Sequence, residues 1–470
     1  MQNSAVVVGS GPNGLAAAIV LARAGMQVEV LEASTQVGGG ASSGELTLPG
    51  FIHDRGSAVH PLGVASPFFS QLPLANHGLR WIWSPAELAH PLDDGTAVLL
   101  YRDIDRTAEQ LGPDAAAWKR IFSPLVRQWK PLVEEVFQPL HIPRHPFLLA
   151  RFGLRAILPA TLLARTAFRG VRARALFAGI AAHSALRLQA PLSSAFGLIL
   201  GAAGHAVGWP IPQGGAQSIT NALSGVLAEH GGRIRTETRV SDLSPLQNNR
   251  LAMCDVTPRQ FLGIAGSKLP ARFRRALEGY LYGPGVFKVD WALNAPIPWT
   301  AKECSTAITV HLGGSMEEIA RSEQLTWDRK PPERPFILLA QQTLYDPTRA
   351  PRGLHTAWAY CHVPNGWDGS ALEQIENQIE RFAPGFRDCV LARSIRTAPQ
   401  MQSWNSNLVG GDVNAGAFTI KQFLLRPTWR WYGTPLPGVY LCSAATPPGG
   451  AVHGLCGYYA ARMALRKLRA

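Results

Sequence analysis

The sequence predicts an α/β fold in two parts, and three observations lead to this prediction. The chain has 470 residues, more than a single hydrophobic core usually supports, so two joined domains are expected. Near its start, an apolar strand, a glycine turn and an alanine-rich helix follow one another directly. Near its end, a strand, a turn and a helix follow in the same order. We therefore expect an α/β domain assembled from separate parts of the chain and joined to an α+β domain.

Composition excludes several classes of protein. Hydrophobic residues make up 46% of the chain and charged residues 16%, which indicates a globular protein rather than a disordered one. The six cysteines are scattered singly, without C-x-x-C pairs or zinc-type spacing, so reduced thiols and no metal site are expected. The chain runs from Met1 into a strand without a charged and apolar leader, which predicts a cytoplasmic protein. Prolines and glycines interrupt the longest uncharged stretch, 188–226, so no membrane-spanning helix is expected.

The first chemistry-bearing motif lies in residues 9–14, Gly-Ser-Gly-Pro-Asn-Gly, between a strand at 5–8 and a helix at 15–24. In such a motif the first glycine allows a tight turn, the second lets the backbone approach a pyrophosphate, and the third lets helix and strand pack closely. A second strand, 27–31, ends on Glu32, whose carboxylate is placed to accept hydrogen bonds from ribose hydroxyls and would repel a 2′-phosphate. The segment predicts a Rossmann-like site for FAD or NAD.

Two further segments favour FAD over NAD. A second glycine run, Val37-Gly38-Gly39-Gly40-Ala41, would bring another stretch of backbone against the diphosphate of a long, extended cofactor. At the other end of the chain, a strand at 438–444 and a turn at 446–450 lead into a helix at about 452–468. The amino end of that helix would stabilise negative charge on a reduced flavin.

Several segments of the chain carry a family resemblance. Residues 32–41, 49–57 and 446–457 resemble the phytoene desaturase-like branch of flavin amine oxidase-type enzymes. Residues 282–291, 349–351, 358–364 and 381–386 resemble the subgroup named for a pyridine nucleotide-disulphide oxidoreductase domain. The chain nevertheless has neither a redox C-x-x-C nor a second G-x-G-x-x-G for NADH or NADPH. The resemblance implies FAD, an amine oxidase-like two-domain architecture and oxidation of a hydrophobic substrate.

The resemblance also implies domain bounds and cofactor contacts. The FAD-binding domain would comprise 1–75, 211–265 and 425–470, with a helical, membrane-facing substrate region at 76–210 and a substrate domain of sheet and helices at 266–424. The expected FAD contacts are Gly9, Gly11, Pro12, Asn13, Gly14, Glu32, Ala33, Gly39, Gly40, Ala41, Ser57, Val240, Ala444, Gly449, Gly450, Val452 and His453.

Few acid or base residues are needed, because the flavin itself accepts the hydride. By resemblance, His60 and His453 would lie close to the flavin ring, where either could hydrogen-bond it or move a proton; the alternative is a structural histidine bonded to backbone.

The substrate face has its own candidates. By resemblance, the segment with Trp209, Pro210 and Gly214 would line the substrate, although Trp209 is also a typical core residue. Strand alternation places Lys288 and Asp290 on one face, where a solvent-exposed pair is favoured over a pocket role.

These features predict an FAD-dependent oxidoreductase that desaturates a lipophilic, isoprenoid or polyene-like substrate and passes electrons to oxygen or a quinone. A redox-neutral flavin isomerase, an amine oxidase and a non-catalytic flavoprotein with a binding role remain alternatives. An amine substrate would call for an aromatic cage around its nitrogen. The sequence does not specify the oligomeric state.

Charge distribution predicts contact with an anionic membrane surface. The chain carries a formal net charge of +13, and residues 136–228 contain no Asp or Glu. The apolar pairs and triplets at 147–149, 157–158, 162–163 and 176–177 lie between arginines, as in a basic amphipathic helix. Nucleic acid is a less suitable partner, because the arginines are interleaved with aliphatic rather than stacking side chains. Peripheral association with the inner membrane is expected, and a solvated basic face is the alternative.

Overall fold

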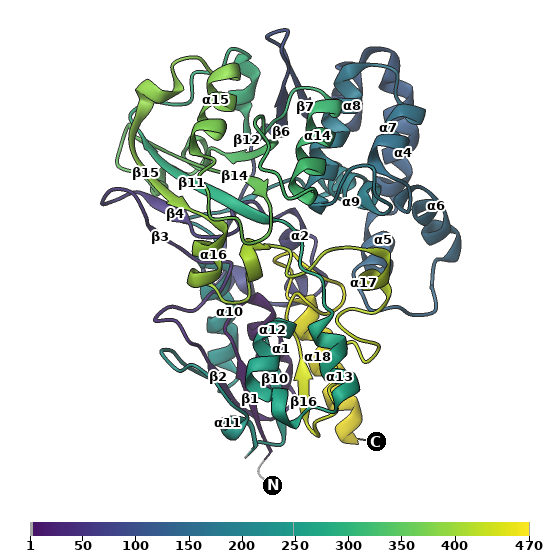
Figure 1. Cartoon of the computed structure of the whole chain (residues 1–470), viewed down its shortest axis with the longest axis vertical. Helices are drawn as coiled ribbons and strands as arrows, with labels where there is room; N and C mark the ends of the chain where they lie inside the picture. The colour runs from purple at the N-terminus through teal and green to yellow at the C-terminus, as the bar shows by residue number, and fades with distance from the viewer. Residues whose placement is uncertain (1–2, 248, 470) are drawn as a thin grey trace.

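The computed structural model describes residues 3–247 and 249–469. It has two lobes, one built on a five-stranded sheet and one on a seven-stranded sheet, with a layer of helices beside the larger sheet (Figure 1). Both ends of the chain lie in the lobe with the five-stranded sheet (Figure 1). Within the described residues, no single helix is long and apolar enough to cross a membrane. Pro146–Ala156 and Ala160–Ala167 reach that length and composition only as a pair bent by 98°.

The smaller sheet is parallel throughout and brings distant parts of the sequence together. Its strands are β1 (Ser4–Val8), β2 (Gln27–Leu31), β9 (Arg233–Arg235), β10 (Leu251–Cys254) and β16 (Val439–Leu441), in the order β16-β10-β1-β2-β9. Along β1, Ala5 and Val7 face one core cluster while Val6 and Val8 face another, as strand alternation requires. The predicted α/β class with a Rossmann-like domain is confirmed.

Helices cover both faces of this sheet. The first face carries α1 (Pro12–Arg23), α10 (Gln217–Glu229) and α18 (Leu455–Arg469), and the second carries α12 (Pro258–Ala265) and α13 (Ala271–Glu278). The short helix α11 (Ser244–Gln247) lies in the same lobe (Figure 1). Because α1 begins directly after β1, its amino end opens at the carboxyl edge of the sheet, where ligands of such folds bind.

The larger sheet is mostly antiparallel, with one parallel pair between β12 and β6. In spatial order its strands are β15 (Val390–Arg396), β11 (Gly285–Leu293), β14 (His355–Val363), β13 (Ile337–Ala340), β12 (Ala307–Leu312), β6 (Ala86–Pro91) and β7 (Ala97–Leu100). The helix α15 (Leu372–Phe382) contributes to the core on one face of this sheet.

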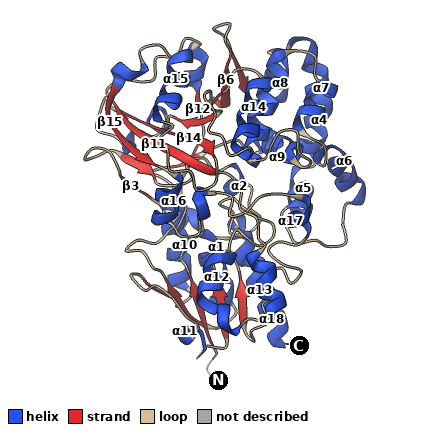
Figure 2. Cartoon of the chain, in the orientation of Figure 1, coloured by secondary structure: helices blue, strands red, loops and turns tan. Residues whose placement is uncertain are grey.

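A layer of helices packs against the other face (Figure 2). It consists of α4 (Ala115–Arg127), α5 (Trp129–Val136), α6 (Pro146–Ala156), α7 (Ala160–Ala167), α8 (Val171–Ala181), α9 (Ser193–Ala206) and α14 (Met316–Trp327). Leu176 and Phe177 of α8 are fully buried in this layer, so the prediction that they face lipid is wrong.

Short elements connect the lobes. The remaining strands are β3 (Ser43–Glu45), β4 (Ile52–Asp54), β5 (Trp81–Ile82) and β8 (Ile211–Pro212), and the remaining helices are α2 (Pro61–Val64), α3 (Ile104–Glu109), α16 (Ala398–Trp404) and α17 (Ile420–Leu424). The hairpin of β3 and β4 and the helix α16 lie where the two lobes meet (Figure 1). The short strands β5 and β8 pair with each other.

Candidate functional site

A cavity of about 1260 Å³ lies between the two lobes and takes its walls from both. At one end it is lined by the glycine loop before α1 and by the residues that follow β2 and β10. At the other end it is lined by the seven-stranded sheet and by the helices α6 and α9. One continuous space therefore joins a nucleotide-type cradle to a largely apolar chamber.

The glycine loop is shaped by close approach of the backbone. Gly9 has φ 96°, a left-handed conformation that favours glycine. A Cβ on Gly14 would lie 2.0 Å from the carbonyl oxygen of Gly9, so the third glycine serves helix and strand packing and does not line the cavity. Gly9, Gly11, Pro12 and Asn13 do line it. The first turn of α1 is thereby open to an anionic group, which its unpaired N–H groups and dipole favour.

Glu32 lies at the carboxyl end of β2 and lines the cavity. Its Oε2 accepts hydrogen bonds from the Ser10 N–H at 2.8 Å and the Ser10 hydroxyl at 2.6 Å, and its Oε1 accepts one from the Ser34 N–H at 2.8 Å. These bonds fix the carboxylate beside the glycine loop and leave lone pairs for ribose hydroxyls. Of the other predicted contacts near this end, Ala33, Gly39, Gly40, Ala41, Ser57 and Val240 line the cavity.

A second carboxyl group at this end was not anticipated from the sequence. Asp255 directly follows β10, is buried, and accepts a 2.8 Å hydrogen bond from the Gly14 N–H. Burial raises its pKa to about 7, and the charge of Glu32 acts in the same direction. Its position after the last residue of a parallel strand could have marked it, because such strand ends line ligand sites. Its partner, however, is 241 residues away in sequence.

The closing segment of the chain forms another wall. Ala444, Gly450 and Val452 line the cavity, together with Pro447, Pro448 and Ala451. Arg426 is buried beside them and donates to the carbonyl oxygens of Ala444, Asn414 and Gly416, while its Nε lacks a partner. The guanidinium lies 4.6 Å from the centre of the Phe418 ring. The sequence interpretation missed this cation.

His453 and Gly449 are not among the cavity-lining residues. The Nδ1 of His453 accepts a 3.1 Å hydrogen bond from the Leu455 N–H at the start of α18. Burial lowers the pKa of His453 to about 3, which keeps the ring neutral and its Nδ1 able to accept. This is the structural, backbone-bonded arrangement that stood as the alternative. Gly449 instead packs against Phe418.

His60 does line the cavity. It is buried, its ring stands 6.1 Å from that of Trp81, and its Nε2 has no hydrogen-bond partner. Burial lowers the pKa of His60 to about 4, so the imidazole is neutral at pH 7. A neutral imidazole nitrogen at a cavity wall is able to accept a proton.

The inner chamber holds Trp209 and a buried ion pair. Trp209 is buried and lines the cavity, with its ring 5.3 Å from that of His183, whereas Pro210 and Gly214 do not line it. Lys288 and Asp290 of β11 form an ion pair and are each 1% exposed, so the expected solvent-exposed pair is wrong. Alternation put both on one face, as predicted, but that face is covered, and His53 of β4 lies 3.7 Å from Asp290. Lys288 lines the cavity.

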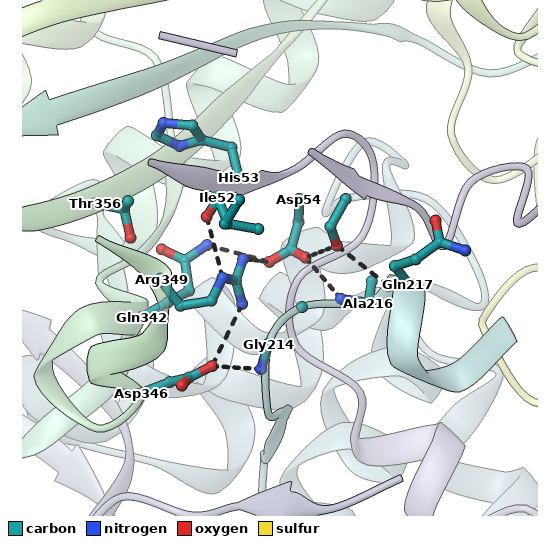
Figure 3. Close-up of polar contacts among 12 residues, drawn as sticks. Ile52, His53, Asp54, Gly214, Ala216, Gln217, Gln342, Asp346, Arg349 and Thr356 are labelled. Carbon is teal, nitrogen blue, oxygen red and sulfur yellow. Dashed lines mark hydrogen bonds and ion pairs between the residues drawn. The ribbon is translucent and has the colours of Figure 1, made fainter. Parts of the chain in front are cut away.

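A buried network around Arg349 ties the cavity walls together (Figure 3). Its Nη2 donates to Asp54 at 2.6 Å, its Nε donates to the Ile52 carbonyl at 3.0 Å, and its Nη1 lies 3.9 Å from Asp346. Asp54 in turn accepts from the Ala216 N–H, and Asp346 accepts from the Gly214 N–H. Burial acts to raise the pKa of Asp54, but Arg349 and these hydrogen bonds hold it below its ordinary value.

The network gives one predicted residue, Gly214, a role although it does not line the cavity. Gly214 belongs to the turn that returns the chain to the smaller lobe, and Asp346 fixes that turn. Asp54 ends β4, and the next residues, Arg55 to His60, line the cavity. Arg349 is therefore a positioning residue for this wall. The sequence showed it only as part of a family motif, because ion pairs between distant segments leave no local pattern.

Buried polar atoms without partners gather on the cavity wall. In the part of the chain that the structure describes, they include Asn13 Oδ1, Arg55 Nε, Thr257 Oγ1, Thr309 Oγ1 and Trp358 Nε1. Since buried polar groups in proteins are nearly always satisfied, these atoms indicate a polar ligand or solvent in the cavity. Residues 3–247 and 249–469 contain no cluster of three or more His, Cys, Asp or Glu placed to hold a metal ion.

Comparisons with known proteins agree with this geometry. Residues 7–72 match the model of an NAD(P)-binding Rossmann-like domain. The chain is 27% identical to pyridine nucleotide-disulfide oxidoreductase domain-containing protein 2 of Rattus norvegicus, over all of this chain and 94% of that one. It is 28% identical to one subunit of the limonene dehydrogenase of Castellaniella defragrans, over 29% of this chain and 25% of that one.

Solved structures extend the comparison to the whole fold. Putrescine oxidase bound to putrescine superposes with a TM-score of 0.62 at 16% identity, covering 100% of both chains. A putative protoporphyrinogen oxidase from Exiguobacterium gives a TM-score of 0.59 at 14% identity, covering 99% of both chains. At this identity the likeness concerns the fold. The chain thus carries a Rossmann-like dinucleotide domain within an amine oxidase fold and is similar over its whole length to a pyridine nucleotide-disulfide oxidoreductase domain-containing protein.

Proposed function

We propose that the chain is an FAD-dependent oxidoreductase that dehydrogenates a lipophilic small molecule. The observation that carries this proposal is the continuous cavity from the glycine loop and Glu32 to the chamber beneath the seven-stranded sheet. A dinucleotide alone would use only the first part of such a space. The second part is a room for a substrate, joined to the first without an intervening wall.

The residues at the first end fit FAD. The loop around Gly11 and the start of α1 would hold the diphosphate, and Glu32 would hold the ribose. A Cβ on Gly39 would lie 3.2 Å from Gly11 Cα, so the two glycine runs meet over one short stretch of the cavity. Asn13 Oδ1 and Arg55 Nε offer unpaired hydrogen-bonding atoms nearby. When bound, the flavin supplies the hydride acceptor.

The chamber supports an uncharged, lipophilic substrate. Among the described cavity-lining residues the carboxylates are Glu32, Asp255 and Glu135. The first two lie at the dinucleotide end, and Glu135 accepts hydrogen bonds from the backbone N–H groups of Arg144 and His145. Lys288 lines the inner chamber and is paired with Asp290, so no carboxylate among the described lining residues of that chamber is free to bind a cationic amine. This disfavours the amine oxidase alternative despite the shared fold.

The substrate class can be stated more narrowly as a proposal. The apolar and aromatic lining suits an isoprenoid or polyene-like hydrocarbon, and the partial relative named for limonene is consistent with that class. In such a dehydrogenation the substrate loses a hydride and a proton, which leaves a new carbon–carbon double bond. His60 Nε2 is the candidate acceptor of the proton, because it is neutral, unpartnered and on the cavity wall. The electrons would pass on to oxygen or a quinone.

The first prediction tests the cofactor. A Cβ on Gly11 would lie 2.9 Å from Asp255 Oδ2, and a valine there would also fill the diphosphate region. We expect purified wild-type protein to carry extractable FAD and the Gly11→Val variant to lose at least about 90% of it, since about 1.4 kcal/mol already changes binding tenfold. Gly266→Ala, where a Cβ would meet nothing within 4 Å, is the matched control.

Two results would contradict the cofactor proposal. One is an unchanged FAD content after Gly11→Val in protein with a normal circular dichroism spectrum. The other is wild-type protein that binds NADH in place of FAD. If FAD is present, anaerobic bleaching by a lipophilic donor separates an oxidase or desaturase from a binding flavoprotein. An isomerase would convert its substrate without net bleaching.

A further inference from the structure

The chamber opens to solvent through a mouth with apolar edges. Six large apolar side chains both line the cavity and are well exposed, and we call them the mouth residues: Leu140, Ile157, Val413, Ile420, Phe423 and Leu424. They come from two regions, the α5–α6 segment and the segment that contains α17, which lie on the same side of the molecule (Figure 1). At the dinucleotide end, by contrast, the exposed lining residues include Ser34, Arg239 and Ser241.

The apolar surface continues outward from the mouth. Ile142 is 91% exposed, Phe147 is 90% exposed and Leu154 is 74% exposed. All three belong to α6 or to the loop that precedes it, and none of them lines the cavity. Large side chains this exposed gain nothing from the fold, and a contiguous group of them marks an interaction surface. We call Ile142, Phe147 and Leu154 the outer rim.

The same surface is free of acidic residues in sequence. Residues 136–228 contain no Asp or Glu, and neither do residues 413–470, so every mouth and outer-rim residue lies in a stretch without acidic residues. The carboxylates that adjoin these stretches include Glu135 of α5 and Asp412, and both are buried. Arg144, Arg151 and Lys421 are exposed beside the apolar side chains. A positive, apolar surface is complementary to anionic lipid headgroups above an acyl layer.

Several arginines between residues 136 and 228 already have partners within the protein. Arg172 donates to the Gln110 and Ala97 carbonyls, and Arg187 pairs with Asp328 at 2.6 Å. Arg165 lies 3.7 Å from Glu317. Arg165, Arg172 and Arg187 thus have partners in the helical layer, whereas Arg144 and Arg151 are exposed in or just before α6, beside the mouth.

We propose that the mouth residues and the outer rim dock on an anionic lipid bilayer, and that lipophilic substrate passes from the bilayer through the mouth into the chamber. Docking is independent of the reaction, whereas the substrate path rests on the proposed function. A second copy of the chain is a poorer occupant, because two surfaces carrying Arg144, Arg151 and Lys421 would repel each other. Docking would seal the mouth against water and shorten the path of an apolar substrate.

Vesicle flotation tests the apolar part of the proposal. The probe is phosphatidylcholine vesicles with or without phosphatidylglycerol, and the variant is Ile142→Ser/Phe147→Ser/Leu154→Ser, which leaves the cavity wall intact. We expect wild-type protein to float with the anionic vesicles and the variant to bind at least about tenfold more weakly. Each substitution by serine removes an apolar side chain that would otherwise be buried in the lipid interface. The matched control, Leu48→Ser/Val171→Ser/Leu391→Ser, changes exposed apolar residues elsewhere and should float normally.

Charge reversal tests the electrostatic part. Arg144→Glu/Arg151→Glu should weaken binding to phosphatidylglycerol vesicles by about tenfold or more at low salt, since each basic residue near such a surface contributes about 1 kcal/mol. Arg233→Glu/Arg334→Glu, on β9 and on the loop before β13, is the control with the same change of net charge. Binding of both variants should fall with salt.

A fluorescent probe reports where the protein meets lipid. A Cys389→Ser background removes the half-exposed native thiol, and Phe147→Cys labelled with an environment-sensitive dye should shift to the blue with vesicles. The fluorescence of a dye on Leu391→Cys, on the edge strand β15, should not shift.

The proposal is overturned if wild-type protein does not float, if the outer-rim variant floats normally, or if that variant only dissociates a dimer. FAD content, measured in every sample, shows separately whether the cofactor assignment has failed.

Discussion

At the scale of single residues, the inner chamber depends on a charge pair that has almost no contact with water. Burial lowers the pKa of Lys288 and raises that of Asp290, while their mutual attraction opposes both shifts. His53 Nδ1 lies 3.7 Å from Asp290, but burial lowers the pKa of His53 to about 3, so it is neutral at pH 7. Asp290 therefore relies on Lys288 as its bonded cation, and Lys288 is the member of the pair that lines the cavity.

Lys288→Met should destabilise the protein strongly, because it leaves the Asp290 carboxylate buried without its bonded partner. Breaking one side of a buried pair costs about 3–5 kcal/mol, whereas replacing both sides by apolar groups is often neutral. We expect a clear fall in melting temperature for Lys288→Met and recovery of most of it in Lys288→Met/Asp290→Leu. Thermal melts of FAD-loaded protein at neutral pH measure both. A single variant that melts like wild type would show that Asp290 is compensated by other groups.

At the scale of elements, the start of α18 is fixed by a neutral imidazole. His453 Nδ1 accepts from the first N–H of the helix, and the His453 carbonyl accepts a 2.6 Å hydrogen bond from the Ser66 hydroxyl. The residues just before it, Ala451 and Val452, line the cavity. His453 thus connects the end of the closing turn to the helix that packs on α1.

His453→Ala should loosen this junction, because it removes the acceptor at the helix start. Loss of a capping acceptor costs about 1 kcal/mol, and His453→Asn should retain part of the effect because its side-chain oxygen can accept. We expect a lower melting temperature and faster FAD release for the alanine variant, with intermediate values for asparagine. If instead alanine leaves both unchanged and alters only the flavin midpoint potential, the ring contacts the flavin as the sequence alone suggested.

Local patterns predicted the elements well, and long-range contacts set the limit. The glycine turn, the apolar residues of the first strand and helix, and Glu32 after β2 all lie within about 30 residues of one another. The Rossmann-like unit could therefore be predicted from the sequence alone. The final helix was expected from about 452 and begins at Leu455, because the His453 turn replaces its first residues. Strand alternation placed Lys288 and Asp290 on one face but could not show that β4, far away in sequence, lies against it. Asp255 and Arg349 act on partners far away in sequence.

At the scale of the whole molecule, many imidazoles are buried, some at the cavity and others inside the larger lobe. The pKa values of His53, His183 and His453 are lowered to about 3, and those of His60, His90 and His205 to about 4, in each case chiefly by burial. The carboxyl groups of Glu87 and Asp255 shift the other way, since burial raises both pKa values to about 7. The two sets of groups have opposite effects on stability as pH changes.

Stability should therefore fall as pH drops below about 6.5, the ordinary pKa of histidine. In that range the unfolded chain binds protons at these histidines and the folded chain does not, so acid favours unfolding until pH approaches 4. Glu87 and Asp255 oppose this, because their contribution is present at low pH and lost as pH rises through about 7, but they are two groups against six. At pH 5 each neutral imidazole costs on the order of 2 kcal/mol, enough together to approach a typical folding free energy.

We expect the melting temperature to fall steeply between pH 7 and pH 5, with release of FAD. His205→Gln should flatten the fall, because glutamine can still accept the 3.0 Å hydrogen bond from Trp118 Nε1 without a proton to gain. A melting temperature that is constant or rises toward pH 5 would mean that these histidines are protonated in the folded protein, and hence that the cavity is wetter than its walls indicate.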